Sequence, residues 1–234
     1  MPRTARTVTF FRSWNTDMAY ILGFLWASGS VRIKSTGAHV IEFANKDIDH
    51  LIAIANCIGE NYSQHIVDAV SQTYRIEFCS KEMYYDLRAL GVTENKSTMD
   101  VPTMAPEYLS HFARGITDGN GSLLWNAGKP VLQIYAAQEG FLADLADAID
   151  IVTGIPAPHI GTNRATCYLK WSTIRAKCLA AWLYIDNPGL ALPRKAAIAE
   201  QFLQWQPGKA PQKGTVTERM SQQFASYLPI LATH

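Results

Sequence analysis

The feature that most limits the possible folds of this chain is an internal repeat. Residues 20–30 (YILGFLWASGS) align without a gap with residues 112–122 (FARGITDGNGS), at an offset of 92 positions. Two glycines and one serine recur at equivalent positions: Gly23 and Gly115, Gly29 and Gly121, Ser30 and Ser122. The same offset places Ser80 on Ser172, each closing a strand-like run. A register that stays constant over this length predicts a duplicated structure with two similar halves.

Hydrophobic periodicity and turn residues predict the same order of elements in each half, namely α-β-β-α-β-β-α. In the first half the segments are 16–27, 30–35, 39–44, 47–60, 64–67, 73–79 and 81–90. In the second half they are 106–119, 122–125, 130–136, 138–152, 159–160, 165–171 and 174–184, with a further helix over 195–204. The predicted fold class is α+β. The predicted organisation is an N-terminal arm (1–13), a first half (14–92), a linker (93–105), a second half (106–206) and a C-terminal tail (207–234).

The two leading helices contain glycines, each of which costs about 1 kcal/mol relative to alanine inside a helix. Gly23 and Ala27 are four residues apart, as are Gly115 and Gly119, so each pair lies on one helical face. Small residues on one face allow two helix backbones to approach closely. We therefore expect the leading helices to contact each other through these four residues.

Composition excludes several classes of protein. The chain is 48% hydrophobic and 18% charged, which is typical of a packed globule and excludes disordered, collagen-like and coiled-coil chains. No stretch approaches the roughly 18 apolar residues of a membrane span, and the first 13 residues lack the apolar core of a secretory signal. The four cysteines form no CxxC pair, which favours reduced thiols in an intracellular protein. The net charge of +1 indicates no partner by itself, because a nucleic-acid binder would have to sort its basic groups onto one face.

Four segments carry a resemblance to a known family. MAYILGFLWASGSV and YLSHFARGITDGNGSLLW are similar to the two motifs of monomeric LAGLIDADG homing endonucleases, and LGVTENKST and PRKAAIAEQF also match that family. The resemblance extends over residues 14 to 205. It implies a pseudo-twofold fold in which the two motif helices join the halves and the β-hairpins form a saddle along the major groove of double-stranded DNA.

The resemblance also implies an activity and a biological setting. One acidic residue per half binds a divalent metal, usually Mg²⁺, and the metal supports hydrolysis of both DNA strands within a long pseudo-palindromic site. Such a protein acts as a monomer, is encoded with an intron or intein, and works in the cytoplasm or an organelle matrix. Intron RNA is the alternative partner, because RNA-splicing maturases share the fold.

The sequence departs from the family at the two positions where the acids belong. These positions, immediately before the closing glycine of each motif, hold Ser28 and Asn120, and neither side chain is anionic. Asp118 does not replace the acid, because it lies two residues before position 120 and its side chain is therefore rotated by about 200° around the helix. We interpret Asp118 as a structural residue. We predict little or no nuclease activity. Either the chain is a naturally degenerate member, or Asp was changed to Asn at position 120 to hold an uncut complex.

At other functional positions, the residues of this sequence match those of the family. Lys96 matches a basic residue that in the family helps position or polarise the hydrolytic water. Lys195 takes the corresponding place in the second half. For each of them, the competing interpretation is a solvated lysine on the surface. The backbone carbonyls of Ala27 and Gly119 match positions that can touch metal, but without the acids they would bind an ion only weakly.

Alternation along the predicted strands indicates a polar face on each sheet. The residues expected to contact DNA are Ser30, Arg32, Lys34, Arg75, Glu77, Lys129, Gln133, Tyr135, Asn163, Arg164 and Lys170. Arginine and glutamine suit bidentate contacts with guanine and adenine, and Lys129 and Arg164 suit phosphate. The acids gather on the segments 47–60 and 138–152, which predicts a basic saddle backed by acidic helices.

Three functions remain open from the sequence. The first is a DNA-binding protein of the homing-endonuclease type, active or disabled. The second is an RNA-splicing maturase, which would tolerate loss of the acids. The third is a duplicated α+β domain that binds a small ligand or another protein. Salt-dependent binding to duplex DNA separates the first from the third, and preference for structured RNA supports the second.

Overall fold

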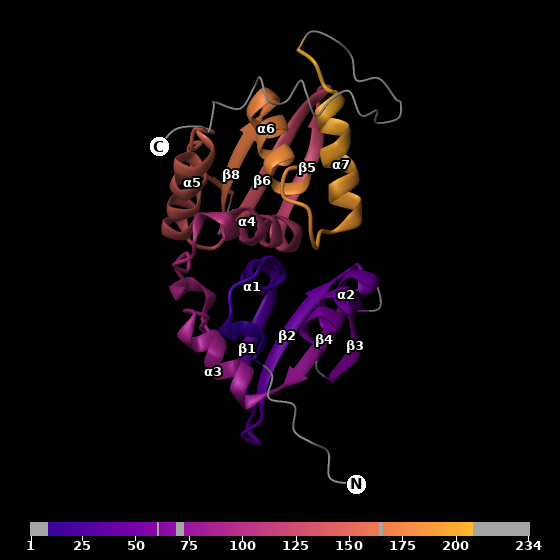
Figure 1. Cartoon of the computed structure of the whole chain (residues 1–234), viewed down its shortest axis with the longest axis vertical. Coiled ribbons are helices and arrows are strands. Elements are labelled where there is room, and N and C mark those ends of the chain that lie inside the picture. The colour runs from indigo at the N-terminus through magenta and orange to yellow at the C-terminus, as the bar shows by residue number, and fades with distance from the viewer. Residues whose placement is uncertain (1–8, 60, 69–72, 164–165, 208–234) are drawn as a thin grey trace.

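The computed structural model describes residues 9–59, 61–68, 73–163 and 166–207. The first half, in the lower part of Figure 1, contains three α-helices and four strands among its described residues. They are α1 (Thr16–Ser28), β1 (Gly29–Ile33), β2 (His39–Asn45), α2 (Ile48–Ile58), β3 (Tyr62–Asp68), β4 (Thr73–Cys79) and α3 (Lys81–Ala89). Two short 3-10 helices that the sequence did not predict flank them, over Phe10–Arg12 and Lys96–Thr98.

The second half repeats this order and adds a helix at its end (Figure 1). Its elements are α4 (Pro106–Asn120), β5 (Gly121–Asn126), β6 (Lys129–Ala136), α5 (Glu139–Thr153), β7 (Gly161–Asn163), β8 (Thr166–Ser172), α6 (Thr173–Tyr184) and α7 (Pro193–Gln204). The predicted α+β duplication is thus confirmed.

Local signals in the sequence explain where the elements begin and end. The Asn15 side chain accepts a hydrogen bond from the Met18 amide and caps α1, and the Ser80 hydroxyl accepts one from the Met83 amide and caps α3. Gly59 and Gly154 end α2 and α5 in the left-handed conformation, which glycine adopts without strain. Equivalent glycines therefore stop equivalent helices.

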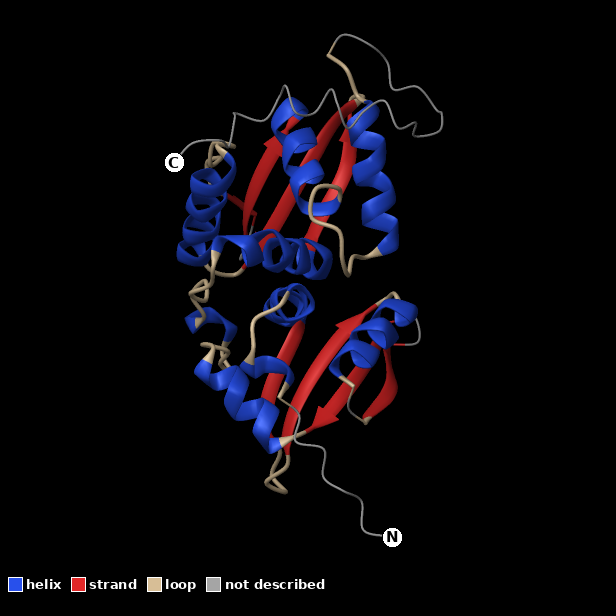
Figure 2. Ribbon diagram, in the orientation of Figure 1, coloured by secondary structure: helices blue, strands red, loops and turns tan. Residues whose placement is uncertain are grey.

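Each half forms a four-stranded antiparallel sheet, with strand order β1-β2-β4-β3 in the first and β5-β6-β8-β7 in the second. The helices lie over one face of each sheet (Figure 2) and contact its strands. That face is apolar: Val31, Ile41, Phe43, Ile76 and Phe78 are buried in the first half, and Leu123, Leu132, Ile134, Leu169 and Trp171 in the second. The alternate residues of the same strands form the opposite face.

The two halves meet through α1 and α4, which lie next to each other at the centre of Figure 2. A Cβ atom added to Gly23 would lie 2.1 Å from the carbonyl oxygen of Phe112, and one added to Gly115 would lie 2.1 Å from that of Tyr20. A Cβ on Gly119 would lie 2.6 Å from the Cβ of Ala27. The structure thus brings together the four small residues that the sequence analysis placed at this contact.

One predicted strand is wrong. The segment 159–160 is not a strand; β7 lies at Gly161–Asn163, where Gly161 pairs with Tyr168 and Asn163 with Thr166. Pro156 and Pro158 lack an amide hydrogen, so the chain before residue 159 is poorly suited to strand pairing. The other predicted segments match observed elements to within two residues at each end.

Candidate nucleic-acid interface

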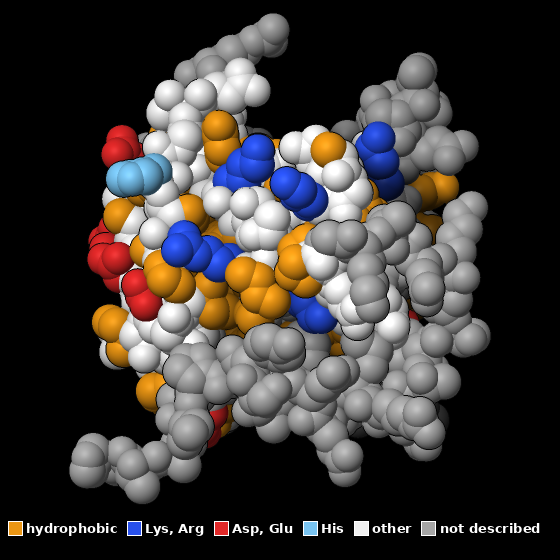
Figure 3. Space-filling model, turned by 90° about the horizontal axis from the view of Figure 1, so that it is seen from above, with side chains coloured by type: hydrophobic (Ala, Val, Ile, Leu, Met, Phe, Trp, Pro, Cys, Tyr) orange, Lys and Arg blue, Asp and Glu red, His pale blue; other side chains and the backbone are white. Residues whose placement is uncertain are grey.

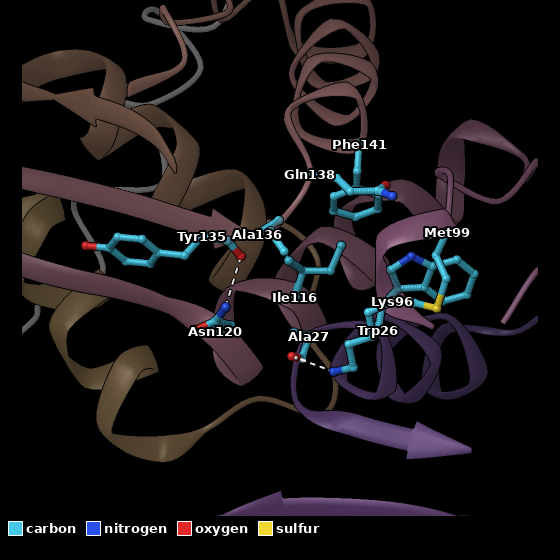
Figure 4. Close-up of a pocket in the computed structure, with 11 residues that line it drawn as sticks. Trp26, Ala27, Lys96, Met99, Ile116, Asn120, Tyr135, Ala136, Gln138 and Phe141 are labelled. Carbon is cyan, nitrogen blue, oxygen red and sulfur yellow. Dashed lines mark hydrogen bonds between the residues drawn. The ribbon is translucent and has the colours of Figure 1, made fainter. Parts of the chain in front are cut away.

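The C-terminal ends of α1 and α4 bring together the two positions where the resemblance implies acids. The Ser28 hydroxyl donates to the carbonyl of Phe24, 3.1 Å away, within its own helix. The Asn120 side-chain amide donates to the carbonyl of Tyr135 at 3.1 Å (Figure 4). An added Cβ on Gly119 would lie 3.0 Å from the Ser28 Oγ, which shows how closely the two helix ends approach. Both side chains are neutral and make backbone hydrogen bonds.

Lys96 reaches the end of α1 from the segment between the halves. Its ammonium donates to the carbonyl of Ala27 at 2.9 Å (Figure 4). Loss of solvation lowers the pKa of the Lys96 ammonium to about 8, so it remains charged at neutral pH. This contact places a fixed positive charge on one of the carbonyls that the resemblance assigned to metal.

Lys195 plays a similar part at the end of α4, from inside the protein. Its side chain is buried, and its ammonium donates to the carbonyls of Thr117, Asp118 and Gly121 at 2.5, 3.0 and 2.8 Å. Burial lowers the pKa of Lys195 to about 8. The three carbonyls belong to the last turn of α4 and the residue after it, where the helix dipole favours a cation.

Asp118 is buried and is the centre of a hydrogen-bond network inside the protein. Its carboxylate accepts hydrogen bonds from the hydroxyls of Tyr20 and Tyr184, at 2.8 and 2.6 Å, and from the Leu192 amide at 2.7 Å. His50 Nε2 lies 2.7 Å from the Tyr20 hydroxyl and completes the network. These contacts support the structural interpretation of Asp118.

The donor set at the helix ends does not fit Mg²⁺. This ion prefers anionic oxygens at octahedral geometry, whereas the site offers a serine hydroxyl, a carboxamide and backbone carbonyls. The Ala27 carbonyl already accepts from an ammonium, whose charge would repel a second cation. Among the described residues no group of three His, Cys, Asp or Glu side chains could hold a metal ion. We therefore derive no hydrolytic step from this site.

The uncovered face of the first sheet carries a network of ion pairs. Arg32 pairs with Glu42 and Glu77, Lys34 with Glu77, and Arg75 with Glu42, at distances of 2.6 to 2.9 Å. Partial burial alone would raise the pKa of Glu77, but the hydrogen bond from Lys34 and the charges of Lys34 and Arg32 hold it below its ordinary value. The basic side chains predicted to contact DNA here are partly neutralised by two glutamates.

The uncovered face of the second sheet has a different charge. β5, β6, β7 and β8 contain no Asp or Glu. Lys129 and Lys170 are exposed, and the structure shows no ion pair for either among the described residues. The Gln133 side-chain oxygen lies 3.4 Å from the Ser122 hydroxyl and accepts from the Tyr135 hydroxyl at 2.9 Å, so these side chains form one polar row.

In the second half the helix α5 carries acidic residues, whereas the strands of the sheet carry none. Figure 3 views the molecule from above, onto the end of the second half rather than onto the uncovered face of its sheet. Lys and Arg side chains lie over the middle of this view, and Asp and Glu lie mainly along its left edge, where α5 lies in Figure 1. α5 carries Glu139, Asp144, Asp147 and Asp150. Asn163 is exposed at the end of β7, and Arg164 lies outside the described residues.

Sequence reasoning missed three features of this region. Glu42 joins the ion pairs of the first sheet, and its alternation with the buried Ile41 and Phe43 was the available signal. The Tyr20–His50–Asp118–Tyr184 network links distant segments, so no local pattern predicts it. Arg114, also buried, donates to the carbonyls of Leu183, Asn187 and Leu190 and ties α4 to the chain around α6 and α7.

The fold is that of the LAGLIDADG homing endonucleases: two α-β-β-α-β-β-α units joined through paired motif helices. Solved structures of this class match the chain. The crystal structure of I-DmoI in complex with DNA and Ca aligns with a TM-score of 0.56 and 15% identity, over 82% of this chain and 98% of that one. I-LtrWI, a LAGLIDADG homing endonuclease bound to target DNA, aligns with a TM-score of 0.56 and 12% identity, over 80% and 88%.

A third structure is of DUF199/WhiA, whose N-terminal domain is described as a LAGLIDADG domain. Full-length DUF199/WhiA from Thermotoga maritima aligns with a TM-score of 0.55 and 17% identity, over 94% of this chain and 70% of that one. No family model matches the sequence, and no curated protein matches it. At these identities the likeness shows the fold. In the part of the chain that the structure describes, no helix is both long and apolar enough to cross a membrane.

Proposed function

We propose that this protein binds duplex DNA across the uncovered faces of its two sheets and does not cleave it. The observation that carries the proposal is the second sheet, whose strands lack acids and present Lys129, Lys170 and the polar row around Gln133. Lysines on such a face suit phosphates, and a glutamine suits adenine. I-LtrWI and I-WcaI, which share this fold, are described as bound to their DNA targets.

The absence of cleavage follows from the ends of the motif helices. Phosphodiester hydrolysis of this type needs a metal that generates hydroxide and stabilises the leaving oxygen. Ser28 and Asn120 supply no negative charge, and the ammonium groups of Lys96 and Lys195 contact carbonyls at the two helix ends. The Lys96 ammonium, at the end of α1, favours the approach of a phosphodiester, so loss of cutting is compatible with retained binding.

The test is the salt dependence of binding to a mixed-sequence duplex, measured by fluorescence anisotropy. Affinity should fall steeply as salt rises, because each phosphate contact releases counterions. Lys129→Gln and Lys170→Gln should each reduce the slope of log affinity against log salt by about 1. Lys81→Gln, at the start of α3 and away from the sheet face, is the matched control and should leave the slope unchanged.

Two outcomes would overturn the proposal. One is no binding to duplex DNA at low salt, which would favour a ligand- or protein-binding role. The other is an identical slope in the wild type and the Lys129 and Lys170 variants, which would remove the sheet from the interface. Tighter binding to structured intron RNA than to duplex DNA would instead support the maturase alternative.

A further inference from the structure

Three side chains lie next to one another across the uncovered face of the second sheet. Ser122 of β5 pairs with Gln133 of β6, and Gln133 pairs with Lys170 of β8. Directly opposite residues of antiparallel strands have Cβ atoms about 4.5–5.5 Å apart, on the same face of the sheet. We call Ser122, Gln133 and Lys170 the cross-strand row, in which Gln133 is the central side chain.

The carboxamide of Gln133 is oriented by its neighbours. Its oxygen accepts a hydrogen bond from the Tyr135 hydroxyl at 2.9 Å and a longer one from the Ser122 hydroxyl at 3.4 Å. A carboxamide oxygen has two lone pairs, so these two donors occupy both. The amide nitrogen carries two hydrogens and has no hydrogen-bond partner among the described residues. Gln133 therefore presents donors and no free acceptor.

This arrangement changes the base that the glutamine recognises. A free glutamine pairs with adenine, because it donates to N7 and accepts from the N6 amino group. At Gln133 the oxygen is occupied, and only the donors remain. In the major groove guanine presents two acceptors, N7 and O6, whereas adenine and thymine present one each and cytosine presents an amino donor. Donors without an acceptor therefore favour guanine.

The rest of the second sheet supports the same preference. Lys170 is exposed and forms no ion pair among the described residues, and a lysine side chain has donors only. The four strands contain no Asp or Glu. No carboxylate of these strands can therefore accept from the amino group of adenine or cytosine.

The equivalent row of the first half is built differently. In each half the row begins at the serine that follows the closing glycine of the motif helix, and in the first half it consists of Ser30, Glu42 and Glu77. Each of the four carboxylate oxygens in this row forms an ion pair with a basic side chain of the same sheet. The arrangement with donors alone thus belongs to the second half, and its effect should appear in one half of a bound site.

We propose that Gln133, with its oxygen held by Tyr135 and Ser122, selects guanine at one position of the DNA half-site that contacts the second sheet. Tyr135 and Ser122 are positioning residues, because they act on the base through Gln133. This inference rests on the proposed function, since it names a base that the proposed DNA-binding face recognises.

The test compares the base preference of variants of the full-length protein. Bound sites are selected from a library of random duplexes with the wild type and with Gln133→Ala, and the position whose preference differs between the two is the one that Gln133 contacts. A G·C pair should dominate there in the wild type. In competition, a duplex with G·C at that position should bind at least about fivefold more tightly than one with A·T. Replacing that guanine by 7-deazaguanine, which lacks the N7 acceptor, should weaken binding and so separates recognition of guanine from recognition of the paired cytosine.

The double variant Ser122→Ala/Tyr135→Phe tests the positioning role, because it frees the Gln133 oxygen. The carboxamide can then accept from N6 of adenine and donate to N7, so the preference for G·C over A·T should fall by at least about fivefold. A merely structural role of the two hydroxyls would weaken binding to both duplexes alike and leave their ratio unchanged. Tyr85→Phe, which removes an exposed hydroxyl of α3, is the matched control and should keep the wild-type ratio.

Four outcomes would overturn this inference while leaving the proposed function intact. They are a selected site that Gln133→Ala does not alter, an A·T pair at the altered position, unchanged affinity for 7-deazaguanine, and an unchanged ratio in the double variant. Absence of duplex binding by the wild type would instead overturn both the proposed function and this inference.

Discussion

Single residues at the ends of the motif helices determine whether this protein can hold a divalent cation. Ser28 and Asn120 are neutral, and the Lys96 ammonium lies 2.9 Å from the carbonyl of Ala27. A hard cation would have to compete with that ammonium for a neutral oxygen. The proposed absence of cleavage therefore rests on the chemistry of a few atoms, within a backbone that follows the homing-endonuclease fold.

The first prediction concerns restoration of the missing charges. Mg²⁺ should leave the melting temperature of the wild type unchanged, whereas the double variant Ser28→Asp/Asn120→Asp should melt at a higher temperature as Mg²⁺ is added. A ligand that binds only the folded state stabilises it by mass action. Differential scanning calorimetry with and without Mg²⁺ measures this effect. A saturable rise in the melting temperature of the wild type would contradict the account.

The second prediction concerns pH. Burial lowers the pKa of both His50 and His111 to about 4, and for His111 the charge of Arg114 adds to the effect. Between pH 6.5 and 4 the unfolded chain binds more protons at these positions, so each histidine lowers the free energy of unfolding as pH falls. By pH 4 this loss amounts to about 3 kcal/mol per histidine.

His50→Leu and His111→Leu isolate these contributions from those of the other buried groups. Urea unfolding across this pH range should show a flatter pH dependence in each variant than in the wild type. The neutral form fits the structure: Tyr20 donates to Asp118, so His50 Nε2 donates to the Tyr20 oxygen. Equal slopes in the wild type and both variants would show that the histidines are not buried as described.

At the scale of elements, the contact between α1 and α4 is the feature on which the arrangement of the halves depends. Backbone lies against backbone at Gly23 and Gly115, where side chains are excluded by carbonyl oxygens of the partner helix. A carbonyl that is part of a helix cannot move aside as the end of a flexible side chain can. Glycine is therefore required at these two positions by the partner helix rather than by the local backbone.

The third prediction reverses the usual effect of replacing glycine in a helix. Gly23→Ala and Gly115→Ala should each lower the free energy of unfolding by about 1–3 kcal/mol or more, because the new methyl would lie 2.1 Å from a carbonyl oxygen. Gly140→Ala, in the first turn of α5 with no atom within 4 Å of the added Cβ, is the control and should stabilise by about 0.4–1 kcal/mol. Chemical denaturation of the three variants measures both signs. A neutral Gly23→Ala would show that the helices are not in such close contact.

Most helices and strands were predictable because they depend on local periodicity. The internal repeat also allowed the predicted elements of one half to be compared with those of the other. The strand Thr73–Cys79 and the start of α4 at Pro106 match the predicted bounds. The segment 159–160 was wrong because a three-residue strand carries too little periodicity to place. The ion pairs of Arg32, Lys34 and Arg75 were not predicted, because they depend on the register of β1, β2 and β4, which alternation alone does not determine.

For the whole molecule, the duplication provides two similar sheets with unequal charge. The first sheet partly neutralises its basic side chains through Glu42 and Glu77, whereas the second sheet exposes Lys129 and Lys170 on strands without acids. The second half should therefore dominate the electrostatic part of DNA binding, and the first half should contribute through arginines already oriented by glutamates. The chain's net charge of +1 hides this distribution.

In the proposed function, the two joined halves bind one DNA duplex without cutting it. The most direct test is selection of bound sites from a library of random duplexes in the presence of Mg²⁺, followed by sequencing of the recovered strands. The account predicts enrichment of a long site with contributions from both ends, recovered intact. Failure to enrich any site, a site confined to one end, or recovery of strands cut at the centre would contradict it.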